Sequence, residues 1–442
     1  MDLMNIGELA IEVLESRGHE AYFVGGCVRD MLMGISPHDL DITTSALPEE
    51  TVSVFDGFRV IPTGLKHGTV TVLIENEPIE ITTFRADGDY SDHRHPETVS
   101  FSKRLSDDLC RRDFTVNAMA YSGRAGVIDL YGGKEDIKNG IIRAVGDPER
   151  RFNEDALRIL RALRFASEKE FSIEPKTAKA LHKCLPLVEF VSAERIFAEL
   201  KKLIMGKGAT EVILKFPEVI CKAVPALAET VGFDQQNPHH IYDVYEHTAY
   251  SVGYCPFEED IRLAALLHDC GKPQTFSVKD GVGHFYGHTD ASLILAREAL
   301  ARLKCDNVTA DTVLTLIKYH DPVIEPSEKA VKRMLNKLGK DNLMKLLSLK
   351  AADNLAQAPM CAGRLAVYGE IRCIVSEIEA KNECFSLKSL KVNGDDLIAI
   401  GLQRGKEIGN ALTILLNAVM DGELINEKEI LLGKIKQIYG LD

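Results

Sequence analysis

The sequence lacks tryptophan altogether, and only 7% of its residues are aromatic. No apolar run approaches the roughly 18 residues that a membrane-spanning helix requires, so we expect no membrane partner. The first residues contain no basic segment, and Glu8 interrupts the apolar stretch that follows them, which argues against a secretory signal. The ten cysteines include no CxxC pair. This spacing favours reduced thiols and a cytoplasmic location over a disulfide framework.

The chain also has fewer basic than acidic residues. The chain has 53 Lys and Arg against 66 Asp and Glu, which gives a net charge of −13. This balance argues against a protein that coats nucleic acid non-specifically, although it permits a local basic groove. The 442 residues are enough for about two to four domains. With 45% hydrophobic and 27% charged residues, global disorder is excluded.

The chain changes character near residue 150. Before it, short β-rich segments alternate with Gly and Pro, and residues 21–24, 69–74 and 79–84 are expected to form strands. After it, apolar residues recur at helical spacing and predict an all-helical remainder. We therefore expect an α+β protein, with a head of mixed sheet and helices followed by a helical neck, body and tail. The expected domains are 1–145, 146–235, 236–325 and 326–442.

Individual helices follow from the same periodicity. Asn153 is expected to cap a helix over residues 154–165. Later helices are expected at 176–184, 192–205, 208–215, 241–253, 260–268, 289–303, 309–319, 328–338, 341–356, 360–380, 393–401 and 404–420.

The first candidate site combines glycines with an arginine. Gly25 and Gly26 follow the first expected strand, and two glycines there let the backbone approach a phosphate closely. Arg29 comes next, at the start of an expected helix, where its guanidinium group could meet phosphate oxygens.

Two carboxylates follow the glycine segment. Asp39 and Asp41 are two residues apart, so on a strand they would project from the same face. Hard oxygen ligands in this arrangement suit Mg²⁺, and a two-metal site supports phosphoryl transfer. Glu80, on the strand expected at 79–84, is a candidate third carboxylate. The alternative is a turn with solvated acids.

A basic segment at 110–121 offers further phosphate donors. Arg111 and Arg112 could each present a bidentate fork to a triphosphate. Asp113 and Asn117 could fix a loop and a ribose hydroxyl. The alternative is a basic turn that leads into a buried strand.

The helix expected at 154–165 carries an acid and three arginines at near-regular spacing. Asp155 and Arg158 are one turn apart, and Arg161 and Arg164 continue the series. An Asp and an Arg together offer an acceptor and donors that complement the Watson–Crick edge of a base. The alternative is an ion pair on a solvated face, with the remaining arginines as surface charge.

Four segments in order carry a family resemblance: GGCVRD, DLD, RRDFTVNAMAY and EDALRILRALRF. Together they resemble the class II tRNA nucleotidyltransferase/poly(A) polymerase group of the DNA polymerase β superfamily. Residues 63–70, 92–96 and 192–200 resemble further segments of that group. The resemblance is strong over about residues 20–205 and implies a polymerase-β-like nucleotidyltransferase head.

The resemblance implies a role for each candidate. Asp39 and Asp41 would be catalytic and would hold two Mg²⁺ ions. Asp155 and Arg158 would read the base of CTP or ATP. The residues implied in binding the incoming nucleotide are Gly26, Arg29, Arg111, Arg112, Asp155, Arg158, Arg161 and Arg164.

The implied activity is the addition of C, C and A to the 3′ end of tRNA from CTP and ATP, with no DNA and no nucleic-acid template. Poly(A) polymerase is an alternative from the same group, disfavoured because the chain is acidic and has no basic extension. Partial enzymes that add only CC or only A are further alternatives. The presence of the segment 92–96 favours complete CCA addition. A purely RNA-binding protein would not need both Asp39 and Asp41.

A second set of residues lies in the region expected to be helical. The order of His247, His268-Asp269 and His320-Asp321 resembles the HD phosphohydrolase superfamily, which implies an HD subdomain. The implied ligands of a transition metal are His247, His268, Asp269 and Asp321. His284 and His288 could bind a second metal or phosphate, whereas His239 and His240 are interpreted as structural.

An HD subdomain would permit a different main activity, namely metal-dependent phosphohydrolysis with the head as a nucleotide sensor. It could equally serve only as a helical part of the body. A basic stretch follows it and is expected to bind the tRNA backbone, with a solvated basic face as the alternative. Its basic residues are Lys329, Lys332, Arg333, Lys337, Lys340, Lys345 and Lys350.

Overall fold

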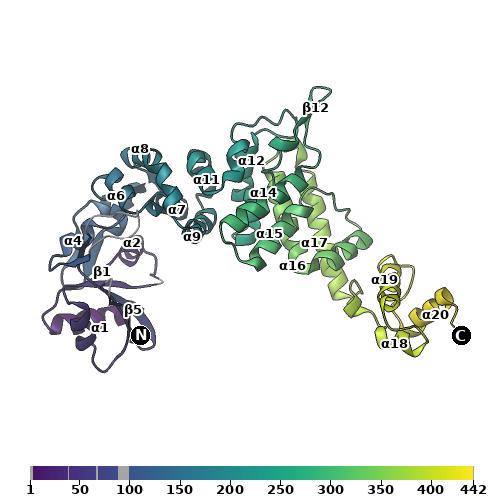
Figure 1. Cartoon of the computed structure of the whole chain (residues 1–442), viewed down its shortest axis with the longest axis horizontal. Helices are drawn as coiled ribbons and strands as arrows, with labels where there is room; N and C mark the ends of the chain where they lie inside the picture. Colours follow the sequence, from purple (N-terminus) through teal and green to yellow (C-terminus); the bar gives the residue numbers. More distant parts are fainter. Residues whose placement is uncertain (1–2, 38, 66–67, 88–98, 442) are drawn as a thin grey trace. The chain divides into compact units, whose positions relative to one another are not determined.

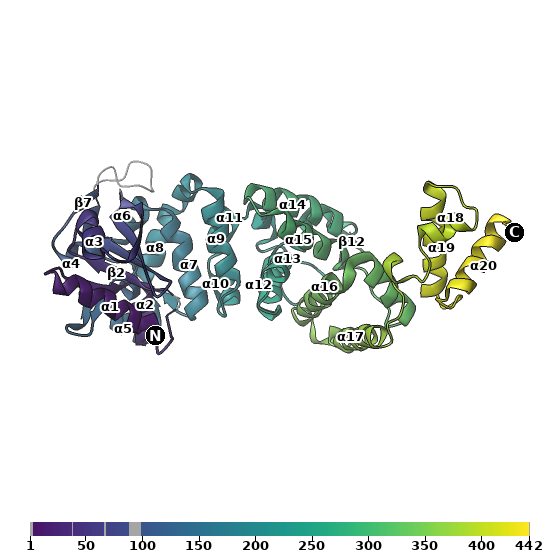
Figure 2. The ribbon, with the colours of Figure 1, turned by 90° about the horizontal axis from the view of Figure 1, so that it is seen from below.

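The computed structural model describes residues 3–37, 39–65, 68–87 and 99–441. The chain forms two compact units, Met1–Pro225 with Arg302–Lys304, and Ala226–Ala301 with Cys305–Asp442. Figures 1 and 2 show the sheet within the first unit and the helices that make up most of the second. The division falls within ten residues of the boundary expected at 235. The boundaries expected at 145 and 325 lie inside the units and stay predictions.

A seven-stranded sheet forms the centre of the first unit, in the order β3-β4-β5-β2-β1-β8-β9. Only β2 and β5 pair in parallel, so the sheet is mixed, as expected. Its strands are β1 Ala21–Val24, β2 Asp41–Thr44, β3 Arg59–Gly64, β4 Thr69–Ile74, β5 Glu77–Thr83, β8 Met119–Ser122 and β9 Gly126–Asp129. A separate ribbon pairs β6 Arg85–Asp87 with β7 Val99–Phe101.

The alternation of β-branched residues explains how this sheet forms. Val70, Val72 and Ile74 of β4 are buried, and the intervening side chains are half-buried. Helix α1 (Leu3–Ser16) packs on the same core. Its Gly7 has no side chain because a Cβ there would lie 2.4 Å from the ring of Phe23. Close helix–sheet packing therefore holds β1 in the centre of the sheet.

Helices occupy the remainder of the first unit. Asn153 is not the cap that we expected: it lies inside α6, and α7 begins only after a break in helical geometry at Asp155. The cap of α6 is Asp147, whose side chain accepts from the backbone N–H of Arg150. The helices are α2 Gly26–Leu32, α3 Pro48–Val54, α4 Leu105–Cys110, α5 Gly133–Asn139, α6 Pro148–Glu154, α7 Leu157–Lys169, α8 Pro175–Cys184, α9 Ala193–Ile204, α10 Ala209–Lys215 and α11 Pro217–Ala223.

The second unit is helical except for one hairpin. Strands β12 (Ser277–Lys279) and β13 (Val282–His284) pair antiparallel, and in the first unit β10 (Ile141–Ile142) pairs with β11 (Ser172–Ile173). The remainder of the chain is therefore mostly helical, as expected, with these short strands as exceptions. The helices are α12 Val244–Tyr254, α13 Glu259–Leu267, α14 His288–Arg302, α15 Asn307–Tyr319, α16 Glu328–Leu355, α17 Arg364–Ala380, α18 Gly394–Ala399, α19 Lys406–Met420 and α20 Lys428–Tyr439. Among the helices described, none has the length and apolarity that crossing a membrane requires.

Candidate functional site

One cavity of about 520 Å³ in the first unit collects the residues that we expected to bind metal and nucleotide. They come from the segments around β1, β2, α4 and α7, which are far apart in the sequence. Within this cavity lie Gly26, Arg29, Asp39, Asp41, Arg111, Arg112, Asp155, Arg158, Arg161 and Arg164.

The carboxylates lie at the start of β2 rather than along it. Asp41 is the first residue of the strand and Asp39 precedes it, so the expectation that both lie on a strand is wrong for Asp39. Glu80 pairs with Asp41 in register on the parallel neighbour β5, but it does not line the cavity. Asp41 faces the cavity. Its partial burial raises its pKa to about 6, and the negative charges of Asp39 and Glu80 act in the same direction. The positive charge of Arg112 opposes this shift.

Gly25 closes the cavity beside these carboxylates. Its φ is +78°, a conformation that side-chain-bearing residues rarely adopt. A Cβ there would lie 3.0 Å from Nη1 of Arg112 and 3.4 Å from Oδ2 of Asp41. A glycine is therefore needed for the turn and for the close approach.

A chain of hydrogen bonds holds the buried Arg29. Its Nη1 donates to Oδ1 of Asn117 at 2.7 Å, and Nδ2 of Asn117 donates to Oδ1 of Asp113 at 3.1 Å. Oδ2 of Asp113 accepts from Nη2 of Arg161 at 2.6 Å. Burial alone would raise the pKa of Asp113, but Arg161 and Asn117 lower it to about 2. Asp113 and Asn117 thus hold the loop, whereas their expected contact with a ribose hydroxyl stays a prediction.

Asp108, on α4, has no solvent exposure and was not identified from the sequence. Its Oδ1 accepts from Nη2 of Arg111 at 2.6 Å, and its Oδ2 accepts from Nη2 of Arg112 at 3.2 Å. Burial opposes its charge, but the two guanidinium groups lower its pKa. One buried acid therefore orients both arginines, and its only sequence signal was its position one turn before them.

Asp155 and Arg158 line the cavity together. Their backbones share a hydrogen bond, but their side chains bond to other residues. Asp155 Oδ2 accepts from Nη2 of Arg195 at 2.9 Å, while its Oδ1 accepts from the N–H of Leu157. Arg158 Nη1 donates to Oε2 of Glu154 at 2.7 Å. Hydrogen bonds to neighbouring residues therefore fix the orientation of each side chain.

Arg164 is not ordinary surface charge either. Its Nε donates to Oε2 of Glu199 at 2.5 Å, and both residues are buried. The guanidinium carbon lies 4.0 Å from the ring centroid of Phe165. Arg164 is thus fixed by α9 and by its own helix, with part of its surface in the cavity.

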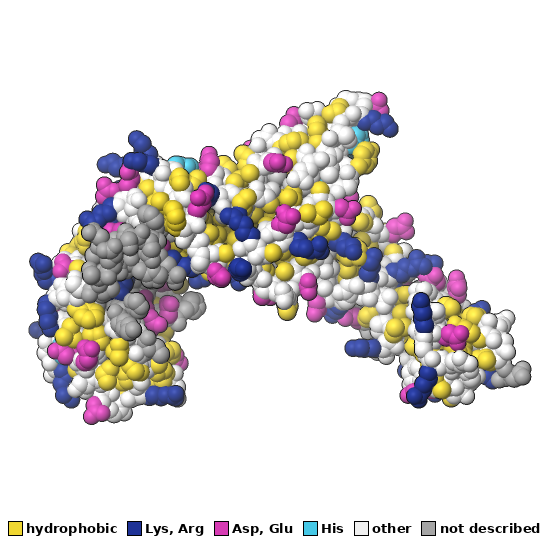
Figure 3. Space-filling model, in the orientation of Figure 1, with side chains coloured by type: hydrophobic (Ala, Val, Ile, Leu, Met, Phe, Trp, Pro, Cys, Tyr) yellow, Lys and Arg dark blue, Asp and Glu magenta, His cyan; other side chains and the backbone are white. Residues whose placement is uncertain are grey.

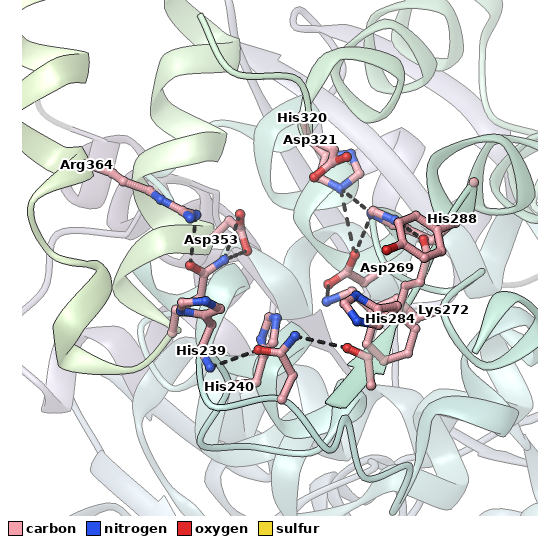
Figure 4. Close-up of a pocket in the computed structure, with 16 residues that line it drawn as sticks. His239, His240, Asp269, Lys272, His284, His288, His320, Asp321, Asp353 and Arg364 are labelled. Carbon is pink, nitrogen blue, oxygen red and sulfur yellow. Dashed lines mark hydrogen bonds and ion pairs between the residues drawn. The ribbon is translucent and has the colours of Figure 1, made fainter. Parts of the chain in front are cut away.

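A second cluster lies in the other unit, around a cavity of about 320 Å³. Figure 4 shows Asp269 and Asp353 directed towards the interior of this cavity, with His288 and His320 beside Asp269. Two groups of residues could each hold a metal ion, because the ligand atoms within each group lie within 4.8 Å of one another. The groups are His247, His268 and Asp353, and His268, Asp269 and His320.

The expected ligand set needs one correction. Asp321 lines the cavity but belongs to neither group, and Asp353 of α16 takes its place. Asp353 lies near the end of α16, between the buried Ala352 and Asn354. Burial opposes the charge on Asp353, but His247 and His268 lower its pKa well below its usual range. Burial likewise opposes the charge on Asp269, and His268 and Lys272 lower its pKa well below its usual range. Burial opposes the charge on His268, but Asp269 and Asp353 raise its pKa to about 10.

The basic stretch in α16 is not a free cationic face. Figure 3 shows Lys and Arg side chains interspersed with acidic ones over the face drawn. Lys332 and Lys350 are buried, and Arg333 donates to both carboxylate oxygens of Asp421. The other contacts are Lys329 with Asp421, Lys332 with Glu328 and Glu383, Lys337 over the Tyr319 ring, Lys340 with Glu379, Lys345 with Asp260, and Lys350 with the carbonyls of His320 and Pro322.

The segment 92–96 lies outside the described residues, so its expected contribution is not placed.

Three protein families match the chain. Residues 21–143 match the Poly A polymerase head domain. Residues 170–215 match the "Probable RNA and SrmB- binding site of polymerase A", and residues 287–435 match tRNA nucleotidyltransferase domain 2.

Relatives extend the similarity over nearly the whole chain. A CCA-adding enzyme of Ligilactobacillus salivarius is 34% identical over 431 residues, which cover 97% of this chain and 95% of that enzyme. A CCA-adding enzyme of Geobacillus stearothermophilus is 35% identical over 95% of this chain and 93% of its own length. The crystal structure of the Bacillus stearothermophilus CCA-adding enzyme in complex with CTP is 29% identical and has a TM-score of 0.72, covering 100% of this chain and 98% of that chain.

Proposed function

The chain belongs to the CCA-adding enzyme family, and from this premise we propose that it adds C, C and A to the 3′ end of tRNA. CTP and ATP are the donors, pyrophosphate is released, and no nucleic-acid template takes part. The observation that carries the proposal is the single cavity into which five aspartates and seven arginines of distant segments converge.

A divalent metal fits the carboxylate end of this cavity. Membership in a nucleotidyltransferase family implies a divalent ion, and Asp39 and Asp41 offer the hard oxygen atoms that Mg²⁺ prefers. Bound there, Mg²⁺ would lower the pKa of the RNA 3′ hydroxyl and neutralise charge on the triphosphate. Glu80 stays a candidate for supporting this end, from the neighbouring strand.

The arginines of the cavity bind and orient the triphosphate. Arg29 is fixed by Asn117, and Arg111 and Arg112 are fixed by Asp108. Because these guanidinium groups are already oriented, little side-chain entropy is lost when a phosphate oxygen replaces water on their free N–H groups. Gly26 allows the backbone to approach the same phosphates. Arg161 and Arg164 support this arrangement from α7.

Base selection follows from the chemistry of Asp155 and Arg158. Cytosine and adenine both present an amino donor beside a ring-nitrogen acceptor on the Watson–Crick edge, whereas uracil and guanine present a carbonyl acceptor and a ring N–H donor. A carboxylate that accepts and a guanidinium that donates complement the first pair and repel the second. Arg195 and Glu154 hold the two side chains in place for this reading.

The test uses tRNA transcripts that end at the discriminator base, after C and after CC. Each labelled nucleotide is supplied with Mg²⁺, separately and in pairs. We expect CTP to extend the transcripts that end at the discriminator base and after C, and ATP to extend the transcript that ends after CC. We expect GTP and UTP to extend none of them. Robust UTP use would contradict it. A long A ladder would indicate poly(A) polymerase, and extension that stops at CC or begins only after CC would indicate a partial enzyme.

We propose a cytoplasmic location, which is supported by the free thiols of the cysteines described. Phosphohydrolysis in the second unit remains a second candidate activity, favoured by the convergence of histidines and carboxylates around its cavity.

A further inference from the structure

Three arginine side chains of the first-unit cavity gather around one aromatic ring, that of Phe165. The guanidinium carbons lie 5.2 Å (Arg29), 5.3 Å (Arg161) and 4.0 Å (Arg164) from the centroid of this ring. Each distance is within the roughly 6 Å over which the face of an aromatic ring attracts a cation. Arg29 belongs to α2 and the other residues to α7, so the ring joins two segments that are distant in the sequence.

The ring of Phe165 is itself fixed by its surroundings. Phe165 is 5% exposed and lines the cavity. Its ring meets that of the fully buried Phe114 edge to face, with the centroids 5.8 Å apart and an interplanar angle of 80°. At the end of α7, Lys169 Nζ lies 3.0 Å from Oδ1 of Asp30, which ties α7 to α2. The ring therefore offers the arginines a surface that does not move.

An aromatic ring can hold these arginines without neutralising them. Each arginine already has one carboxylate partner, namely Asp30 for Arg29, Asp113 for Arg161 and Glu199 for Arg164. A further carboxylate would occupy more N–H donors and cancel positive charge that a triphosphate requires. The face of a ring attracts a cation but carries no net charge. Three guanidinium groups are thus held close together while their charge remains available to phosphate.

We propose that Phe165 is a positioning residue for the triphosphate of the incoming nucleotide. Its ring keeps Arg29, Arg161 and Arg164 in the arrangement that binds phosphate before the nucleotide arrives. An arginine released from the ring samples other rotamers, and the apparent affinity falls with the fraction of molecules that keep the competent arrangement. The inference rests on the proposed function, because that function assigns the triphosphate to this cavity.

A series of fluorinated rings at position 165 tests the proposal. Phe165 is replaced by phenylalanine that carries one, two or three fluorine atoms, which withdraw electron density from the ring face and change its size little. Isothermal titration calorimetry with Mg²⁺ measures the Kd of CTP, ATP and inorganic triphosphate. We expect the Kd to rise with each fluorine and to reach at least about fivefold with three, by the same factor for all three ligands. Phe165→Leu, which removes the ring, should lose at least as much.

The same fluorinated residues at position 152 are the matched control. Phe152 is fully buried in α6, and in the part of the chain described no Lys or Arg side chain lies over its ring, so the Kd should not change. Equal shifts at both positions would overturn the proposal. A Kd that is constant or falls over the series at position 165 would also overturn it, and with a weakened Phe165→Leu would show that only side-chain volume matters. Circular dichroism checks that each protein is folded.

Addition of labelled CTP to a tRNA transcript that ends at the discriminator base separates this inference from the proposed function. The fluorinated Phe165 proteins should show a raised KM for CTP with kcat within about twofold of the parent. A loss of folded protein would instead lower the apparent kcat and leave the Kd unchanged. A parent protein that binds inorganic triphosphate but adds no nucleotide would contradict the proposed function alone. A parent that binds neither CTP nor inorganic triphosphate would contradict both.

Discussion

At the residue scale, buried carboxylates determine where the arginines of the first unit point. Asp108, Asp113, Glu154 and Glu199 each accept from one or two guanidinium groups that line the cavity. Charge-assisted bonds of this kind are about twice as strong as neutral ones. The cavity is therefore organised before nucleotide arrives.

Asp113 makes the pH dependence of this organisation measurable. Its folded pKa of about 2 is below the unfolded value near 3.9. The charged pair with Arg161 therefore adds stability that is fully present above about pH 4 and is lost as the pH falls towards 2. Asp113→Asn should lower the free energy of unfolding by about 2 kcal/mol at pH 7 and by less below pH 4.

Urea unfolding at pH 7, 5 and 3.5 checks this expectation. Asp56→Asn, on the exposed turn after α3, is the control and should change stability little at each pH. A deficit for Asp113→Asn that is constant over this range would show that its ionisation is not the cause.

Arg158→Lys should relax base selection rather than abolish catalysis. Lysine keeps the positive charge but loses the planar fork, so the preference for CTP and ATP over UTP and GTP should fall about 10- to 100-fold. Ratios of kcat/KM for the four nucleotides measure this change. Arg17→Lys, on the exposed turn after α1, should leave the ratios unchanged. Equal losses for all four nucleotides would assign Arg158 to phosphate binding.

The sequence predicted a residue of the site only where that residue belongs to a recognisable motif. The ten first-unit residues carried such motifs and all line the cavity. Asp108 and Asp353 carried none, because their importance comes from chains of contact between segments distant in the sequence. Asp353 lies 84 residues after Asp269, and only the packing of α16 brings it to His247. Asp321 was chosen instead because it follows His320 directly.

At the element scale, periodicity placed most helices within a few residues. It located β1, β4 and β5. It also separated 328–338 from 341–356, and the structure has a non-helical residue, Gly339, between these two parts of α16. It missed the break at Asp155 because helical spacing continues through it, whereas the side chain of Asp155 is held by contacts with Arg195 and the backbone of Leu157. The hairpin β12–β13 and the helix α11 were missed because short elements carry little periodic signal, and α20, with 12 residues, was missed as well.

The kink in α16 can be tested with two glycines. Gly339 has φ 74° and ψ 165°, a region that is essentially restricted to glycine. Because a Cβ there would meet no atom within 4 Å, Gly339→Ala isolates the backbone cost, expected at about 1–3 kcal/mol.

Gly369→Ala in the interior of α17 is the matched control. Its Cβ also meets open space and its φ is not positive, so alanine should stabilise the helix by about 0.5–1 kcal/mol. Thermal unfolding followed by circular dichroism should show a lower midpoint for Gly339→Ala and a slightly higher one for Gly369→Ala. Similar shifts for both would mean that the kink is not required.

At the scale of the whole molecule, a net charge of −13 opposes association with RNA. Attraction must come from local cationic groups, and the α16 stretch is largely occupied by internal partners. We therefore expect tRNA binding to depend steeply on salt. Raising KCl from 50 to 200 mM should increase the KM for tRNA by at least about tenfold. Steady-state kinetics check this, and a KM independent of salt would indicate recognition without phosphate contacts.

Each unit has its own cluster of charged residues around its own cavity. We propose that Asp39 and Asp41, in the cavity of the first unit, support the addition of three nucleotides. The most direct measurement is the product length, at nucleotide resolution, when a tRNA transcript ending at the discriminator base is incubated with Mg²⁺, CTP and ATP. We predict growth by three residues that then stops, and no growth with Asp39→Asn/Asp41→Asn. Continued growth beyond three residues, or undiminished growth in the double variant, would contradict it.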